Sequence, residues 1–159
     1  MTRTPENPIA NGSITPLRAD DLDDVVAIDS ALSGTSRRGF FEKRLAAALD
    51  EPGDFIHVGL RQEKRLVGYA LARLVEGEFG KPGARAALDA IGVDPALRGK
   101  ASGRRLLAAV EELLRHKGVS ELTSQVEWEK RGLLGFFASA GFAMAPRIVL
   151  TRPTAQPIS

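Results

Sequence analysis

The most informative stretch of the sequence is residues 91–104, which read IGVDPALRGKASGR. Its first residues end a strand-like segment, and a proline-containing turn then leads directly into an amphipathic helix. The start of a helix has backbone N–H groups without intrahelical partners and carries partial positive charge, so it can receive phosphate oxygens. Four small residues would let a ligand approach the main chain closely: Gly99, Ala101, Ser102 and Gly103. Three basic residues add positive charge: Arg98, Lys100 and Arg104.

The same stretch also has a plainer interpretation. An ordinary strand-to-helix turn uses glycine for tight geometry, and its basic residues are then simply solvated. Short patterns of arginine and glycine are common, so the surrounding sequence has to decide between an anion site and a plain turn.

Hydrophobic periodicity around this stretch predicts alternating strands and helices. The carboxylates of Asp20 and Asp21 can cap a first helix indicated by Leu22, Val25 and Ile28. Residues 61–64 form a polar turn that makes a hairpin of its two flanking strands. The expected strands are 14–17, 55–60, 65–75, 84–93, 121–128 and 142–150, and the other expected helices are 40–49, 102–117 and 130–140, with Gly118 as a helix stop.

This order, β-α-α-β-β-β-α-β-α-β, predicts an α/β fold in which helices flank a mixed sheet, rather than a doubly wound dinucleotide fold. The chain has 159 residues, the length of one ordinary domain. We expect a single domain over residues 13–152, between a flexible N-terminus at 1–12 and a flexible tail at 153–159.

Composition excludes several classes of function. The sequence has no cysteine, which rules out disulfides, thiolate metal sites and a cysteine nucleophile, and its two histidines, His57 and His116, are far apart. We therefore expect no metal. The formal net charge of +2 is too small to indicate nucleic acid binding, and no apolar run reaches the length of a membrane span. The polar start of the chain is unlike a signal peptide, so we expect a cytoplasmic protein with neither nucleic acid nor membrane as a partner.

Residues 93–107, VDPALRGKASGRRLL, resemble the cofactor-binding motif of the GNAT family of acyl-CoA-dependent N-acyltransferases, V-x-P-x-x-R-G-x-G-x-G-x-x-L-L. Ala101 replaces a glycine of that pattern, and its methyl group is tolerable if φ there is negative. Residues 133–142, LLGFFASAGF, resemble the family's second signature, a helix that carries an aromatic residue and ends in Gly-Phe. With the opening at residues 14–18, the resemblance extends over about residues 13–151.

The resemblance implies a GNAT-like fold with a central, mostly antiparallel mixed sheet, whose strands splay apart at a slot for acetyl-CoA or CoA. The strand that ends near Val93 and the strand at 121–128 would frame this slot, and the acceptor would enter from the opposite side. By motif position, the main chain at 91–93 would face the acyl-pantetheine arm, and the amides at 99–104 would face the pyrophosphate. The implied cofactor-binding residues are Ile91, Gly92, Val93, Arg98, Gly99, Lys100, Ala101, Ser102, Gly103, Arg104 and Phe137.

The catalytic groups depart from the family pattern. Phe137 stands where many members have a tyrosine that protonates the departing sulfur, and it cannot do this; it is interpreted first as a packing residue, with lining of the pantetheine tunnel as the alternative. A thiolate with a pKa of about 8.5 can leave without an acid, so a base that deprotonates the amine matters more. Asp89 and Glu127 are the candidate bases, ahead of Glu78, and each also suits an ordinary surface or ion-pair role. Tyr69 is interpreted as a core or rim residue, and Trp128 as an acceptor-pocket or core residue.

Three functions follow from the sequence. The first is transfer of an acetyl group from acetyl-CoA to a primary amine by direct attack, with an amine-bearing small molecule or peptide as the acceptor. The second is a catalytically weak acyl-CoA-binding module of the same fold, which Phe137 favours. The third is an unrelated phosphate-binding α/β domain, although the Walker pattern is absent. The resemblance alone also implies a homodimer.

Overall fold

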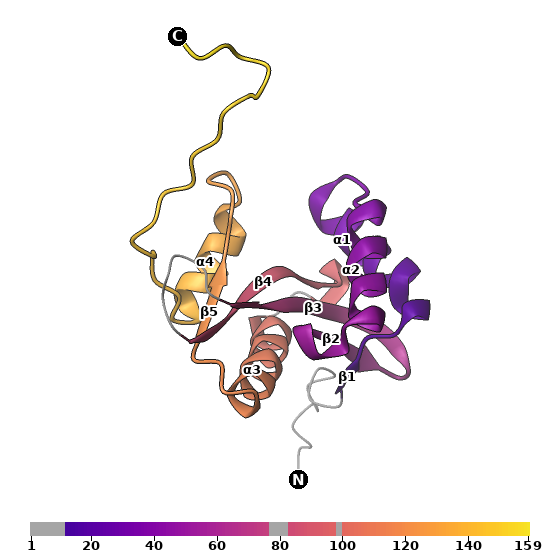
Figure 1. The fold of residues 1–159 in the computed structure, drawn as a ribbon. Coiled ribbons are helices and arrows are strands. Elements are labelled where there is room, and N and C mark those ends of the chain that lie inside the picture. Colours follow the sequence, from indigo (N-terminus) through magenta and orange to yellow (C-terminus); the bar gives the residue numbers. More distant parts are fainter. Residues whose placement is uncertain (1–11, 77–82, 98–99) are drawn as a thin grey trace. The chain divides into compact units, whose positions relative to one another are not determined.

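The computed structural model describes residues 12–76, 83–97 and 100–159. The chain divides into two units, one that runs to Gln125 and one from Val126 to Ser159, and each is described by itself (Figure 1).

The first unit is built on a five-stranded sheet with the order β1-β2-β3-β4-β5 (Figure 1). Neighbouring strands from β1 to β4 are antiparallel, and β4 and β5 are parallel. The sheet is therefore mixed, as the element order predicted, and mostly antiparallel, as the resemblance implied. Its strands are β1 (Ser13–Pro16), β2 (Phe55–Gln62), β3 (Arg65–Glu76), β4 (Ala84–Val93) and β5 (Glu121–Ser124).

Helices cover both faces of this sheet. On one face, α1 (Leu22–Ser33) and α2 (Arg38–Asp50) pack on β3, with the rings of Phe41 and Tyr69 5.5 Å apart. On the other face, α3 (Lys100–His116) lies so close to β3 that a Cβ added at Gly68 would be 3.0 Å from Leu106 Cδ1. Because successive strand residues point to opposite faces, Gly68 and Tyr69 place α3 opposite α1 and α2. The core thus has an apolar layer on each side of the sheet.

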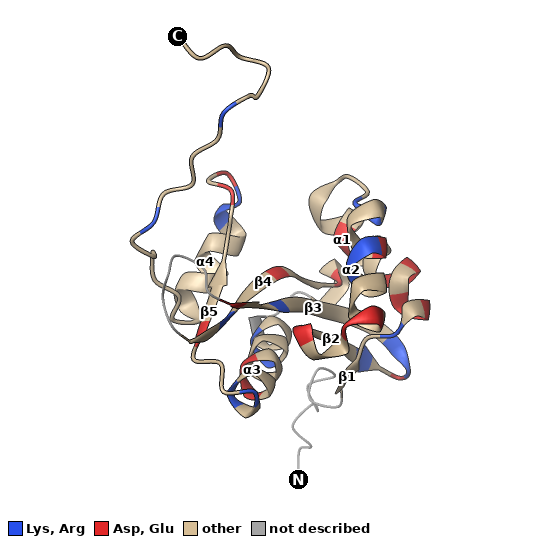
Figure 2. Cartoon of the chain, in the orientation of Figure 1, with Lys and Arg blue, Asp and Glu red and all other residues tan. Residues whose placement is uncertain are grey.

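Local sequence signals explain most of these elements. The β2–β3 hairpin turns at Glu63 and Lys64, whose φ values of 51° and 66° are both positive, as a two-residue hairpin turn of the primed type requires. Gly118 follows α3 with φ of 75°, which confirms the predicted stop. Acidic residues gather at the start of α1 (Figure 2). Asp21 accepts a hydrogen bond from Arg18 N–H at 2.8 Å, but this caps the 3₁₀ turn at Ala19–Asp21 before α1, not α1 itself.

Two strand predictions at the C-terminal end of the chain were wrong. The predicted strand at 121–128 ends at Ser124, where its pairing with β4 stops. The predicted strand at 142–150 is not a strand in the second unit, whose one helix among the described residues is α4 (Arg131–Ser139). Ile148 and Leu150 are 86% and 88% exposed, and Pro146 has no N–H to donate to a ladder. An apolar pattern makes a strand only where a neighbouring strand accepts its hydrogen bonds.

Candidate functional site

Halfway along β4, one edge of the strand loses its neighbouring strand. Its parallel pairing with β5 extends from Arg85 opposite Glu121 to Leu88 opposite Ser124, and no further. Pairing with β3 continues past this point to Val93, which lies opposite Gly68. Among the described residues, β4 therefore has a neighbouring strand on only one side from Asp89 onward. This is the splay that the sequence resemblance implied.

The register of β3 and β4 decides which backbone groups face the open edge. Asp94 N–H donates to Val67 O at 2.8 Å across this pair. Because hydrogen-bonded and non-hydrogen-bonded pairs alternate in an antiparallel ladder, Gly92 directs its N–H and C=O toward Tyr69, its partner on β3. Ile91 and Val93 direct theirs away from β3, toward the edge that β5 leaves open. Of the three residues expected to face the acyl arm, these two have main-chain groups there without a strand partner in the described part of the chain.

A β-bulge lies at the point where this edge opens. The β3–β4 register shifts between Leu71, which pairs with Ala90, and Ala72, which pairs with Leu88. Asp89 is thus the extra residue on β4. Bulges bend a strand and redirect a side chain, and they are common beside active sites. The bulge therefore places the Asp89 carboxylate where the two parallel strands separate.

The segment after β4 leads into the start of α3. Asp94 follows the strand and accepts a hydrogen bond from Ala96 N–H at 3.0 Å, which supports the 3₁₀ turn at Pro95–Leu97. Arg65 holds the same carboxylate in an ion pair of 2.5 Å. Arg98 and Gly99 lie outside the described residues, as does the side chain of Lys100. The first turn of α3, Lys100–Gly103, carries the N–H groups that have no partner within the helix.

Side chains in the first turns of α3 face different environments. Ala101 and Arg104 are exposed, Gly103 is partly exposed and Ser102 is fully buried. Ser102 Oγ lacks a hydrogen-bond partner in the described structure, and it lines a narrow gap with Gly12, Leu60, Gln62, Val67 and Leu97. The Ser102 hydroxyl therefore points into the protein, and only its backbone amide is suited to a ligand at the helix start.

The two candidate bases are in different units. Asp89 lies in an ion pair with Arg73, whose Nε is 3.1 Å from Oδ2, and Arg44 Nε approaches the same oxygen at 3.5 Å. Any proton that Asp89 accepts must compete with these contacts. Glu127 lies in the second unit, in the exposed segment between β5 and α4. Glu78 lies outside the described residues.

Tyr69 belongs to the core, in agreement with one of the two roles expected of it. Its hydroxyl donates to Asp29 Oδ1 at 3.1 Å, and only 1% of the residue is exposed. Arg37 grips the same carboxylate with Nε at 2.9 Å and Nη2 at 2.5 Å. Burial, reinforced by the charge of Asp29, raises the pKa of Tyr69 well above its usual range. Tyr69 is thus a structural donor between β3, α1 and the start of α2.

Two aromatic residues of the second unit have contrasting environments. Phe137 is 5% exposed, and its ring centroid lies 4.8 Å from that of Phe142 and 5.5 Å from that of Phe136. Packing within its own unit accounts for these contacts. Trp128 is 84% exposed, so the core role considered for it was wrong.

Sequence reasoning missed Arg44 from α2 and Arg73 from β3, which contact Asp89, and His57 from β2, which lies near enough to Arg44 for the charge of Arg44 to help lower its pKa. Each looks like an isolated polar residue in the sequence. The one available signal was the spacing of Phe55, His57 and Arg73 on adjoining strands, and it acquires meaning only once the register of the hairpin is known.

Within residues 12–76, 83–97 and 100–159, no helix is both long enough and apolar enough to span a bilayer. Nor does that part of the chain contain three or more His, Cys, Asp or Glu side chains grouped to bind a metal ion.

Comparison with known proteins identifies sequence relatives of this chain. A mycothiol acetyltransferase of Clavibacter sepedonicus is 27% identical over 139 residues, which cover 84% of this chain and 43% of that protein. A second, from Propionibacterium freudenreichii subsp. shermanii, is 29% identical over 133 residues, which cover 80% of this chain and 41% of that protein. The chain thus spans less than half the length of these curated relatives.

Solved structures share the fold. The aminoglycoside N-acetyltransferase AAC(6')-Iy in complex with CoA superposes with a TM-score of 0.76 at 17% identity, over 91% of this chain and 96% of that one. The model of the Acetyltransferase (GNAT) family matches residues 24–142, which include the open edge of β4, the start of α3 and α4. The chain therefore belongs to the Acetyltransferase (GNAT) family.

Proposed function

We propose that this protein is an N-acetyltransferase that moves an acetyl group from acetyl-CoA to a primary amine by direct attack. The observation that carries this proposal is the position of the open β4 edge, which leads within a few residues into the start of α3. A strand edge with free amide groups suits the amide-containing pantetheine arm, and a helix start with small residues suits a pyrophosphate. Family membership and the CoA-bound structural neighbour support the same ligand.

The residues fit this ligand along its length. The amides of Ala101, Ser102 and Gly103 would meet the pyrophosphate, and their small side chains let it approach the helix. Arg98, Gly99, Lys100 and Arg104 complete this proposed pyrophosphate site. Main-chain groups of Ile91 and Val93 would hold the acyl-pantetheine arm as a neighbouring strand would, while Gly92 keeps β4 attached to β3.

The departing thiolate needs little help from the protein. Acetyl-CoA, when bound, supplies an activated acyl group and a thiolate that leaves without an enzymic acid, because a thiol has a pKa of about 8.5. Phe137 has no acidic hydrogen, and the Tyr69 hydroxyl is already engaged as the donor of a hydrogen bond to buried Asp29. The incoming amine must lose a proton, for which Asp89, directly or through water, is the carboxylate on the open strand, and Glu127 is the alternative.

The acceptor is an amine-bearing small molecule or peptide. Relatives named for mycothiol and aminoglycoside acetylation support small polar acceptors. Two basic residues at the start of α2 are already paired, because Arg37 contacts Asp29 and Arg38 contacts Asp23 and Glu42. These residues are therefore poorly suited to bind a charged acceptor. A homodimer stays a prediction.

Release of free thiol from acetyl-CoA over an amine panel tests the proposed activity. We expect Asp89→Asn to lower kcat about 100-fold or more while the dissociation constant for CoA stays the same, because a proton acceptor acts only in the chemical step. Glu127→Gln is the paired variant that identifies the alternative base. Release of thiol at the wild-type rate in both variants would exclude both carboxylates.

The absence of a tyrosine hydroxyl at Phe137 favours one second function, an acyl-CoA-binding module with little turnover. Calorimetric binding of acetyl-CoA without thiol release from any amine, peptide or antibiotic would support that module over the transferase.

A further inference from the structure

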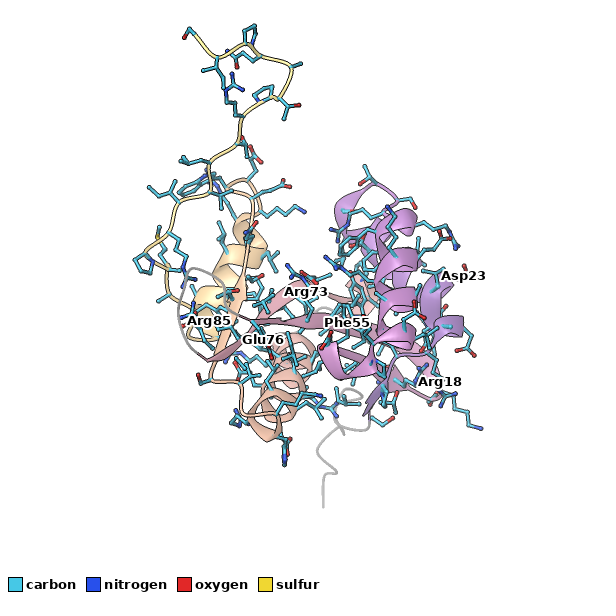
Figure 3. All side chains as sticks on the ribbon, in the orientation of Figure 1. Arg18, Asp23, Phe55, Arg73, Glu76 and Arg85 are labelled. Carbon is cyan, nitrogen blue, oxygen red and sulfur yellow. The ribbon has the colours of Figure 1, made fainter. Side chains whose placement is uncertain are left out.

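Four side chains from α2 and three neighbouring strands form a polar cluster on the sheet face that α1 and α2 cover: Arg44, His57, Arg73 and Asp89. We call them the Asp89 cluster. Arg73 (labelled in Figure 3) lies opposite Phe55 in the β2–β3 register, and His57 is two residues beyond Phe55 on the same face. Phe40 and Phe55 border the cluster, with the Arg44 guanidinium 5.3 Å from the Phe40 ring centre and the His57 ring 5.4 Å from that of Phe55.

The cluster is not satisfied by the protein itself. Arg44 Nε, Asp89 Oδ2 and both ring nitrogens of His57 are inaccessible to solvent and lack a hydrogen-bond partner in the described structure. Asp89 Oδ2 has ion-pair contacts only. A buried polar atom without a partner costs about 1–3 kcal/mol, and native proteins contain few of them. Because Arg44 Nε and Asp89 Oδ2 contact each other at 3.5 Å, the two ring nitrogens of His57 are the groups left without a partner, so the described structure satisfies the cluster only in part.

The arginines have donors to offer. Both contact Asp89 through Nε, and within the described residues no hydrogen bond involves the Nη atoms of either one. Their side chains are 30% and 35% exposed, so both arginine side chains are partly accessible from outside. Arg37 differs, because its Nε and Nη2 both donate hydrogen bonds to Asp29 in a bidentate ion pair. A guanidinium with a free planar edge is suited to two parallel hydrogen bonds with a carboxylate.

The balance of charge points to an anion. Desolvation, assisted by the positive charge of Arg44, lowers the pKa of His57 to about 4, so the imidazole is neutral near pH 7. Two guanidinium groups then face one carboxylate, which leaves an excess positive charge. A polycationic acceptor would be repelled here, whereas a carboxylate would neutralise the excess.

The cluster is also close to the proposed reaction position. Asp89 is the bulged residue at the opening of β4, two residues before Ile91. Two residues along a strand span about 7 Å. An acceptor that places its carboxylate on the arginines could therefore reach the acyl group at the open edge with an amine a few bonds away.

We propose that the Asp89 cluster is an acceptor subsite that binds a carboxylate of the amine substrate through Arg44 and Arg73, with Asp89 holding both guanidinium groups in position. This proposal rests on the transferase activity proposed above and narrows the acceptor class to amino acids and other amines that carry a carboxylate.

A set of matched acceptors tests the subsite. We would compare 5-aminopentanoate, 5-aminopentanamide and 1,5-diaminopentane, which share one amine and chain length but end in an anion, a neutral amide or a cation. L-alanine and L-alaninamide form a second pair with a shorter spacing. The measurements are thiol release and, independently, calorimetric binding of each acceptor to the CoA-loaded protein. We expect kcat/KM and affinity to be at least tenfold higher for one or both acids than for the corresponding amide.

Arginine variants assign that preference to the cluster. Arg73→Gln should reduce the acid-to-amide ratio to about one by raising KM for the acid, and Arg44→Gln should do the same. Arg44→Lys keeps the charge without the planar edge and should restore part of the preference. Lys43→Gln, which removes an exposed cation from the neighbouring position on α2, should leave the ratio unchanged. Thermal melting identifies any variant that fails because it is unfolded.

The outcomes separate this proposal from the activity on which it rests. Thiol release with equal or better rates for the amide and the diamine would contradict the subsite and leave the transferase intact. Preferential binding of the acids without thiol release would contradict the transferase and leave the subsite. Failure of both acids to bind, or an acid preference that survives Arg73→Gln, would overturn the subsite.

Discussion

Ser102 and Tyr69 both bury a hydroxyl group, but only the Tyr69 hydroxyl has a hydrogen-bond partner in the described structure. Tyr69 donates to Asp29, which also receives two hydrogen bonds from Arg37, so this group is well satisfied. Ser102 has no partner in the described structure and faces the apolar side chains of Leu60, Val67 and Leu97. At the residue scale, Tyr69 should therefore stabilise the first unit and Ser102 should weaken it.

Replacement of Ser102 with alanine should stabilise the protein. The change removes a buried hydroxyl that has lost its water without gaining a partner, and we expect the free energy of unfolding to rise by about 1 kcal/mol. Ser30→Ala, at a partly exposed position on α1, corrects for the higher helix propensity of alanine. Urea denaturation of the two variants measures the difference. A loss of stability in Ser102→Ala would mean that the hydroxyl has a partner.

Replacement of Tyr69 with phenylalanine should destabilise the protein without abolishing turnover. The variant loses a buried hydrogen bond to a charged group, which contributes about 1.5–3 kcal/mol. Chemical denaturation gives the stability, and thiol release gives kcat, which should fall less than about threefold. A loss of 100-fold or more in kcat by a folded variant would instead assign Tyr69 a role in proton transfer.

His57 should make stability depend on pH. Its pKa in the folded protein is lowered to about 4 from 6.5, so the unfolded chain binds this proton more tightly. The contribution of the neutral His57 ring to the free energy of unfolding is fully present above pH 6.5 and is lost as the pH falls toward 4. We expect this loss to be ~2 kcal/mol after allowance for the partial exposure of the ring.

Denaturation at several pH values tests this dependence. His57→Gln should flatten the decrease between pH 6.5 and 4, whereas His116→Gln, at an exposed position on α3, should keep it. An equal slope in the two variants would show that His57 titrates normally.

At the scale of elements, β4 performs three tasks in ten residues. Its first half pairs with β5, its bulge projects Asp89, and its last residues present an open edge. Gly92 lies directly over the Tyr69 ring, where an added Cβ would be 2.8 Å from Cε1 and 3.0 Å from Leu32 Cδ1. Close approach to the core, not backbone conformation, therefore requires glycine at this position.

Replacement of Gly92 with alanine should destabilise the protein by about 1–3 kcal/mol, because the methyl group overlaps the Tyr69 ring. Gly39→Ala is the control, since nothing lies within 4 Å of a Cβ there and α2 should gain stability from alanine. Denaturation midpoints measure both changes. An unchanged midpoint in Gly92→Ala would show that the ring moves freely.

Local sequence patterns were sufficient to predict most helices and strands, but not which of them pair or pack together. Residues 102–117 and the hairpin at 55–75 carry their own periodicity and turn signals, and both were predicted to within a few residues. The strand expected at 142–150 failed because strand formation depends on a partner that local pattern does not reveal. The open edge and α3 follow from contiguous motifs, whereas Arg44, His57 and Arg73 come together only through register and the β4 bulge.

At the scale of the whole molecule, the first unit holds the open edge, the start of α3 and the Asp89 cluster. The second unit contributes the candidates Glu127 and Phe137. We therefore expect the cofactor to be recognised mainly by main-chain groups and small residues of the first unit. Affinity for the cofactor should then survive side-chain changes away from the proposed site, but not added bulk or negative charge at the start of α3.

Calorimetric titration of acetyl-CoA into wild type and Gly103→Glu tests this claim most directly. The substitution places a carboxylate and added bulk in the first turn of α3, and Gly39→Glu makes the same change in the first turn of α2, where space is open. We expect at least a 100-fold loss of affinity in Gly103→Glu, wild-type affinity in Gly39→Glu, and a folded protein by circular dichroism in both. Wild-type affinity for acetyl-CoA in a folded Gly103→Glu protein would contradict the placement of the pyrophosphate at α3.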